Sequence, residues 1–160
     1  MCNIGRWATQ VTVAATLTAF LRQRLIGEDK NAGELIMSYK GKTQLTFVIM
    51  APPDLVGEGD RIFKSHASWM EATHHRDGEK ALLSYTVSKA PELSNPFDSS
   101  SAPTGNTCFI LDEYYESSAG VADHFQQAMS SWQDFFAFVE WLGKCQVSGV
   151  PVAPVFNALW

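Results

Sequence analysis

The stretch LTFVIM at residues 45–50 limits the fold more than any other part of the sequence. It is apolar on both faces of an extended chain and is closed by Pro52 and Pro53, which is typical of a strand buried on both sides. The runs at residues 81–87 and 107–115 have a similar character, so we predict two more strands there. A sheet built from such strands needs protein packed against both of its faces.

Helical patterns alternate with these strands. Residues 60–75 place apolar side chains on one side and charged side chains on the other, which predicts an amphipathic helix. A second helix is predicted to begin at Ser117 or Ser118. A further helical run up to Gly143 is either an extension of that helix or a separate one. Residues 150–160 are apolar but contain two prolines, so we expect an irregular strand at a sheet edge.

The predicted order is β-α-β-β-α-(α)-β, which is the order of a ferredoxin-like α+β fold with an antiparallel sheet and its helices on one face. Residues 89–106 are rich in proline, serine and asparagine and are expected to form a long loop. The helices leave the second face of the sheet uncovered, and no internal repeat supplies a second sheet. We therefore predict a homodimer in which two sheets pack face to face.

The length of 160 residues, with 46% hydrophobic and 18% charged residues, suits one globular domain. We expect that domain to span residues 37–160. Residues 1–36 are poor in acidic residues and are interpreted as an extension. They are a transit peptide on one reading, and on another Met37 is the true start. We predict a cytoplasmic protein, or an organellar one if residues 1–36 are a transit peptide.

Charge and cysteine content argue against several classes of function. The net charge of -5, without a cluster of Lys and Arg, is not that of a nucleic-acid-binding protein. The apolar run at residues 11–21 is too short to span a bilayer, so no membrane partner is expected. The three cysteines are far apart and form no C-x-x-C motif, which argues against a disulfide scaffold and a zinc ribbon.

His66 lies in the apolar stripe of the first predicted helix and should point toward the sheet. It is either a buried neutral histidine with one hydrogen-bond partner, or a base in a cavity between helix and sheet. His74 lies at the edge of the same stripe, about 12 Å further along the helix axis. That separation is too long for one shared metal ion, and no H-x-x-x-H motif is present, so no metal site is predicted.

Other candidate residues lie on the second and third strands. Tyr85 and Phe109 are either walls of a pocket or plain core, and Asn106 is either part of a turn or a residue at the pocket mouth. Asp112 and Glu113 are neighbours in a strand and so point to opposite faces, which prevents them from acting as a carboxylate pair.

The passage FILDEYYESSAGVADHF, which starts at Phe109, resembles the dimeric α+β barrel superfamily and, within it, antibiotic-biosynthesis-monooxygenase-type domains. In that group the third strand ends in an acidic and an aromatic residue, and the following helix bears a histidine. Glu113, Tyr114, Tyr115 and His124 match in order. The resemblance covers about residues 43–160. The long loop and the aromatic run near residues 132–142 depart from it. Members include cofactor-free oxygenases, haem-degrading enzymes, isomerases, lyases and proteins without known activity.

The resemblance implies a cofactor-independent monooxygenase-like enzyme that acts on a small planar hydrophobic or aromatic molecule. The expected catalytic residues are His66, His124 and Tyr85, with no cofactor. The alternative is a non-catalytic homodimer that binds a small ligand, including haem held by one of its buried histidines, His66, His74 or His124. The residues expected to contact the substrate are Trp69, Met70, His74, Asn106 and Phe109.

Overall fold

Four strands form one antiparallel sheet in the computed structural model, which describes residues 38–159. They are β1 (Thr43–Ala51), β2 (Leu82–Leu93), β3 (Pro103–Tyr115) and β4 (Gln146–Pro154), and their order across the sheet is β2-β3-β1-β4. The predicted α+β class is confirmed, and this order is compatible with a ferredoxin-like fold. The predictions about residues 1–36 and about a start at Met37 lie outside the described residues.

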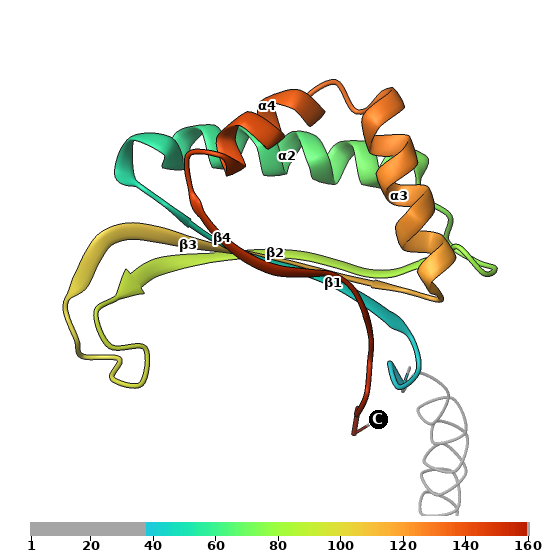
Figure 1. Cartoon of the computed structure of the whole chain (residues 1–160), viewed down its shortest axis with the longest axis horizontal. Helices are drawn as coiled ribbons and strands as arrows, with labels where there is room; N and C mark the ends of the chain where they lie inside the picture. Colours follow the sequence, from blue (N-terminus) through green and yellow to red (C-terminus); the bar gives the residue numbers. More distant parts are fainter. Residues whose placement is uncertain (1–37, 160) are drawn as a thin grey trace, which may run out of the picture. The chain divides into compact units, whose positions relative to one another are not determined.

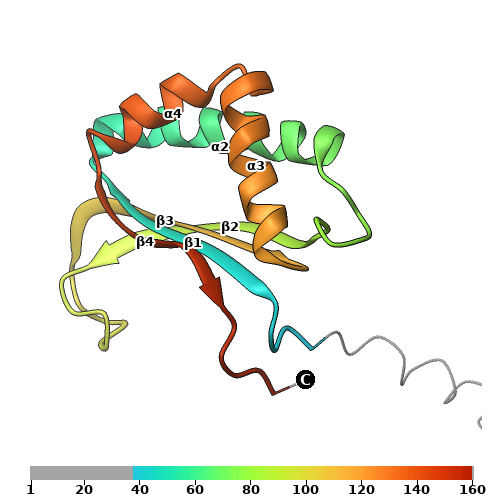
Figure 2. The same cartoon turned by 45° about the vertical axis from the view of Figure 1, so that its right-hand side comes forward.

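The helices lie on one face of the sheet, as predicted (Figures 1 and 2). A short 3-10 helix, η1 (Pro53–Leu55), leads into α2 (Val56–Thr73), and α3 (Ser118–Ser131) and α4 (Phe135–Leu142) follow β3. The hydroxyl of Ser117 accepts a hydrogen bond from the Ala119 backbone N–H and so caps α3. Because α3 ends before Trp132, α4 is a separate helix. Within residues 38–159, no helix is both long and apolar enough to cross a bilayer.

The predicted loop at residues 89–106 is wrong for half of its length. β2 continues to Leu93 and β3 begins at Pro103, so only residues 94–102 connect the two strands. Lys89 pairs with Phe109, and the ladder continues past Pro91 with a register shift. The prolines are tolerated because β2 is an edge strand and Pro103 is the first residue of β3. The result is a hairpin arm that projects away from the helices (Figure 1).

The last strand lies at the sheet edge beside β1, as its prolines predict. Its predicted range of 150–160 is wrong at both ends, since β4 spans Gln146–Pro154. The pairing with β1 shifts between Gln44 and Thr46, which is the expected irregularity. Gly149 allows β4 to lie close to β1, because a Cβ atom at this position would lie 2.6 Å from the carbonyl oxygen of Thr46.

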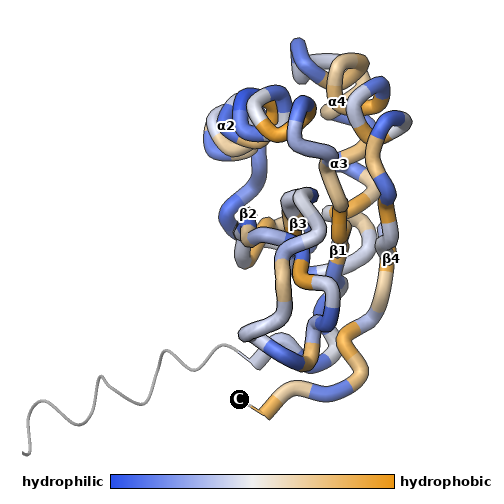
Figure 3. Tube along the Cα trace, turned by 90° about the vertical axis from the view of Figure 1, so that its left-hand side faces the viewer, coloured by the Kyte–Doolittle hydropathy of each residue, from blue (hydrophilic) through white to orange (hydrophobic). Residues whose placement is uncertain are grey.

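The two faces of the sheet differ in chemistry. The face toward the helices is buried, whereas the other face carries half-buried Val48, Met50 and Ile110 and is covered by no described element (Figures 1 and 3). One end of that second face is polar, because the Asp112 carboxylate accepts hydrogen bonds from Gln44 at 3.0 Å and from Thr46 at 2.5 Å. This uncovered face is the one for which the sequence predicts a second copy of the chain.

Candidate functional site

Glu113 lies at the centre of a polar cluster between the sheet and the helices. The alternation along β3 sends Phe109, Leu111, Glu113 and Tyr115 to the helical side, and Glu113 is fully buried with an exposed fraction of 0%. Its Oε2 accepts a hydrogen bond from the Tyr115 hydroxyl at 2.6 Å. Its Oε1 has no hydrogen-bond partner. A buried carboxylate oxygen without a partner is rare and calls for a functional explanation.

Two histidines from different helices meet beside this carboxylate. His124 lies on α3, and its Nδ1 is 3.9 Å from Glu113 Oε2. His74, at the C-terminal end of α2, places its Nε2 3.0 Å from the same Nδ1 of His124. The Nδ1 of His74 in turn lies 3.1 Å from the Thr73 hydroxyl. A chain of polar groups therefore runs from the end of α2 through α3 to the C-terminal part of β3.

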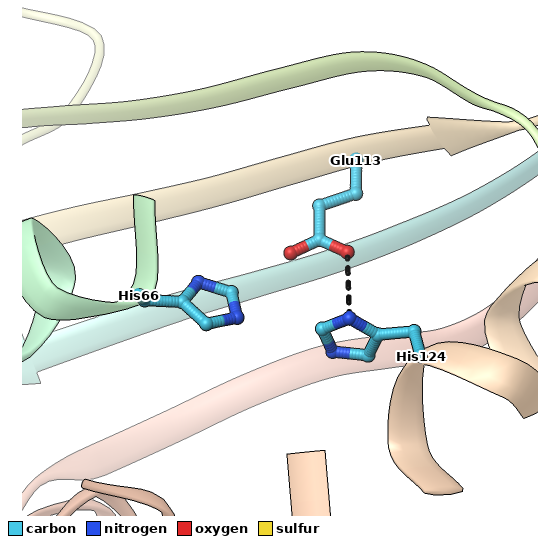
Figure 4. A group of neighbouring side chains, drawn as sticks. All are labelled: His66, Glu113 and His124. Atoms are coloured by element: carbon cyan, nitrogen blue, oxygen red, sulfur yellow. Dashed lines mark ion pairs between the residues drawn. The ribbon is translucent and has the colours of Figure 1, made fainter. Parts of the chain in front are cut away.

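His66 approaches Glu113 from the opposite side, from the middle of α2 (Figure 4). Its Nδ1 lies 3.2 Å from the hydroxyl of Tyr85 on β2. The rings of His66 and His124 are 5.5 Å apart between centroids. One ligand atom from each of His66, Glu113 and His124 can be chosen so that all three lie within 4.8 Å of one another.

Two tryptophans enclose the histidines. The indole of Trp132 lies 4.6 Å from the His66 ring and that of Trp69 lies 5.5 Å from it, between centroids. Each indole N–H is held by a serine, since Trp69 donates to Ser131 at 3.0 Å and Trp132 donates to Ser65 at 3.1 Å. These hydrogen bonds fix the walls of the cluster, so the histidines lie in a preformed aromatic enclosure.

Burial controls the protonation of the cluster. Desolvation lowers the pKa of His66 and His124 to about 3 and that of His74 to about 4, and the neighbouring histidines add to the effect for His66 and His124. Desolvation raises the pKa of Glu113 to about 7, against the lowering effect of the Tyr115 hydrogen bond. At neutral pH the three rings are therefore uncharged and each keeps a free lone pair, although the lowered pKa makes each ring a weaker base than an exposed histidine.

A cavity of about 360 Å³ opens beside this cluster, between α2 and β2. Tyr85 and Met70 belong to its wall, and Tyr85 is also the hydrogen-bond partner of His66. Burial raises the pKa of Tyr85, so this phenol is protonated over the physiological range. The remaining lining residues are Ala67, Glu71, Arg76, Leu82, Leu83 and Ser84.

The structure brings most of the predicted site residues together but not all of them. His66, His124, Tyr85, Trp69 and His74 belong to the cluster, and Met70 lies in the wall of the cavity.

Phe109 and Asn106 lie elsewhere. Phe109 packs in a separate aromatic core against Phe63, at 5.5 Å between centroids, and against Trp141. The amide of Asn106 donates to Glu92 at 2.9 Å at the base of the hairpin arm.

Sequence reasoning did not select Glu113, Tyr115 and Trp132 as site residues. Strand alternation places Glu113 and Tyr115 on the same face as Phe109, but Ile110 makes the opposite face apolar as well, so alternation alone does not show which face is buried. Trp132 gives no periodic signal, because it lies in the short link between α3 and α4. Only the angle between those helices brings its ring to His66.

Comparison with known proteins identifies no relative. No protein-family model matches the chain, and neither the curated proteins nor the solved structures contain a significant match.

Proposed function

We propose that the chain is a cofactor-independent monooxygenase-like enzyme of the dimeric α+β barrel type, acting on a small planar hydrophobic or aromatic molecule. The observation that carries the proposal is the convergence of two neutral histidines, His66 and His124, on the buried carboxyl group of Glu113 inside walls of tryptophan. The strand order and the helices on one face support the assignment to this fold type.

The proposed reaction needs only a base, dioxygen and a dry pocket. A neutral histidine removes a proton from an acidic C–H group of the substrate, and the resulting anion gives one electron to dioxygen. The two radicals combine and take back the proton to form a hydroperoxide. Loss of water then turns the original CH₂ group into a carbonyl, so that one oxygen atom of O₂ enters the product and the other leaves as water.

The cavity between α2 and β2 is the proposed entrance for the substrate. Its volume of about 360 Å³ suits a small molecule, and Met70 and Leu82 give it apolar wall. Tyr85 connects the cavity to His66 through a 3.2 Å contact. We infer that the Tyr85 hydroxyl orients the oxygen of the substrate while His66 accepts the proton.

The test measures oxygen consumption by chelator-treated protein with anthrone-type substrates, which carry the CH₂ group that the reaction needs. His66→Gln and Tyr85→Phe are expected to lower kcat/KM by about 10²–10⁴-fold, the range typical of a lost acid–base group. His75→Gln is the matched control, because His75 is exposed and its ring lies 3.7 Å from Asp123, outside the cluster. Binding of these compounds without turnover would instead support the alternative, a non-catalytic ligand-binding protein. Neither binding nor turnover would refute both functions.

The same proposal includes a homodimer formed through the second face of the sheet. Val48, Met50 and Ile110 lie there half-buried and without a covering layer among the described residues. An identical face would cover these apolar side chains and would have its own covered in return. We therefore propose a second copy of the chain as the partner of this face.

Native mass spectrometry of the whole chain tests the dimer. We expect a dimer for the natural chain and a monomer for Ile110→Glu, because the added charge would be desolvated at the centre of the interface. Gln126→Glu, on the exposed side of α3, is the control and should stay dimeric. A monomeric natural chain would refute the sheet-to-sheet arrangement.

A further inference from the structure

We propose that His66, Glu113 and His124 form a binding site for one divalent first-row transition-metal ion. The inference goes beyond the proposed function, which uses these groups only as acid and base. It also differs from the excluded pair of histidines on one helix, because the three ligands come from three separate elements, α2, β3 and α3 (Figure 4).

The three side chains are close enough to share an ion after small rotations. Their ligand atoms lie within 4.8 Å of one another. Two ligands bonded at about 2.1 Å with a tetrahedral angle between them lie about 3.4 Å apart. No pair therefore has to approach by more than about 1.4 Å, which side-chain torsions provide without movement of the backbone.

The unpartnered oxygen of Glu113 points independently to a ligand. Oε1 is buried, accepts no hydrogen bond and belongs to a residue with no exposed surface. Among residues 38–159, no lysine or arginine forms an ion pair with this carboxylate. A cation at the cluster would give Oε1 a partner and would offset the cost of burying the carboxylate charge.

The two histidines would bind the ion through different ring nitrogens. Nδ1 of His66 lies beside the Tyr85 hydroxyl, and Nδ1 of His124 lies beside Nε2 of His74. None of the hydrogen bonds of the described residues involves Nε2 of His66 or His124. With its proton on Nδ1, His66 presents a free lone pair at Nε2, and the Tyr85 hydroxyl holds the ring in place as outer partners do at metal centres. The nitrogen of His124 that faces the carboxylate is Nδ1, 3.9 Å from Oε2 (Figure 4), so His124 would bind the ion through Nδ1 and give up its contact with His74.

The donor set limits the kind of ion. Two imidazoles and one carboxylate, with no cysteine of residues 38–159 in the group, suit Fe²⁺, Mn²⁺, Co²⁺ or Zn²⁺ better than the harder Ca²⁺ and Mg²⁺ or Cu⁺, which prefers sulfur ligands. Three protein ligands leave at least one coordination position open for water or another small molecule. The walls of this position include Trp69 and Trp132, whose rings are held by serine hydroxyls.

The experiment titrates chelator-stripped full-length protein with Co²⁺, followed by visible absorption, and with Zn²⁺, followed by calorimetry, without any substrate. We expect one ion per chain. His66→Gln and Glu113→Gln should each weaken binding by about 100-fold or more. His75→Gln and Glu140→Gln, which change exposed groups outside the cluster, should bind as the natural chain does.

Several results would overturn the proposal. They are the absence of binding by the natural chain, unchanged affinity in both His66→Gln and Glu113→Gln, and loss of binding in His75→Gln, which would indicate a surface site. Near-ultraviolet circular dichroism checks the fold of each variant, and His66→Gln decides if Glu113→Gln does not fold.

The metal titration tests the metal site and the oxygen-consumption assay tests the proposed enzyme activity, so either result can be negative without the other. The titration contains no substrate, and the assay uses chelator-treated protein. Turnover that appears only after the metal is restored would support the site and refute the cofactor-independent mechanism.

Discussion

The helix–sheet interface has two halves that are built from the same elements but differ in chemistry. Toward α4, α2 and β3 contribute Phe63 and Phe109, which pack around Trp141 with centroid separations of 5.5–5.8 Å. Toward α3, the same helix and strand contribute His66 and Glu113. We call these the aromatic half and the histidine half.

Burial has opposite consequences in the two halves. In the aromatic half burial is favourable, because each ring exchanges contact with water for contact with other apolar side chains. The indole N–H of Trp141, which is polar, donates a hydrogen bond to the Leu55 carbonyl oxygen at 3.0 Å. In the histidine half burial holds three imidazoles neutral and leaves a carboxylate oxygen without a partner. Aliphatic side chains of similar volume would pack there at lower cost, so the polar groups are best explained by function.

The largest loss of stability is expected from a cavity in the aromatic half. Phe109→Ala should lower the free energy of unfolding by about 3–5 kcal/mol, because it leaves a cavity beside Phe63 and Trp141. The matched control is Phe97→Ala in the hairpin arm, where the ring is 98% exposed and the change should stay within about 0.5 kcal/mol. Chemical denaturation measures both, and equal losses would contradict the assignment of Phe109 to the core.

The histidine half should make the metal-free protein sensitive to acid. The folded-state pKa values of His66, His74 and His124 lie below the unfolded value of 6.5, so the unfolded chain binds more protons and stability falls as the pH decreases below about 6.5. Glu113 has the opposite effect between about pH 4.5 and 7, because its folded pKa is raised.

Because the three histidines act against the single Glu113, the free energy of unfolding should fall by up to about 3 kcal/mol per pH unit where its dependence on pH is steepest. Denaturant unfolding of chelator-treated protein between pH 7 and pH 5 measures the slope. His66→Gln should flatten it, whereas His75→Gln should not. A slope near zero in the natural chain would mean that the histidines are not held neutral by burial.

Two glycines of α2 test how tightly the aromatic half is packed. A Cβ atom at Gly59 would lie 2.6 Å from the Trp141 ring, so Gly59→Ala should cost about 1–3 kcal/mol. At Gly57 a Cβ atom would meet nothing within 4 Å, and Gly57→Ala should stabilise the helix by up to about 1 kcal/mol. Thermal unfolding compares the two variants, and the same sign for both would contradict the close contact.

The smallest change in stability is expected from Glu113→Gln in metal-free protein at pH 5. The natural carboxyl group is mostly protonated there and the amide also accepts the Tyr115 hydrogen bond, so the free energy of unfolding should change by no more than about 1 kcal/mol. As the pH rises toward 8 the natural chain loses stability by ionisation and the variant does not, so the difference should move in favour of the variant. A difference independent of pH would show that the pKa of Glu113 is not raised.

Part of the histidine half is predictable from the sequence. Helical periodicity placed His66 on the buried side of α2, and the resemblance pointed to His124. The role of Glu113 was only half predicted, because alternation separates it from Asp112 without showing which of the two is buried. The convergence of His74 and His124, which are 50 residues apart, depends on the angle between α2 and α3, and no local pattern encodes that angle.

The hairpin arm shows a second limit of sequence reasoning. Proline and serine content favoured a loop at residues 89–106, yet half of those residues extend β2 and β3. Local propensity is a weak guide there, because the neighbouring strand supplies the backbone hydrogen bonds and Pro91 lies on a sheet edge.

The sequence by itself determined the element order, the α+β class and the side of α2 that faces the sheet, because hydrophobic periodicity is a local property of the chain. The tertiary structure alone decided that Glu113 lies between His66 and His124, and that Phe109 belongs to a core away from them. These relations join residues dozens of positions apart, and they are set by the packing angles of whole helices, to which every side chain of the interface contributes.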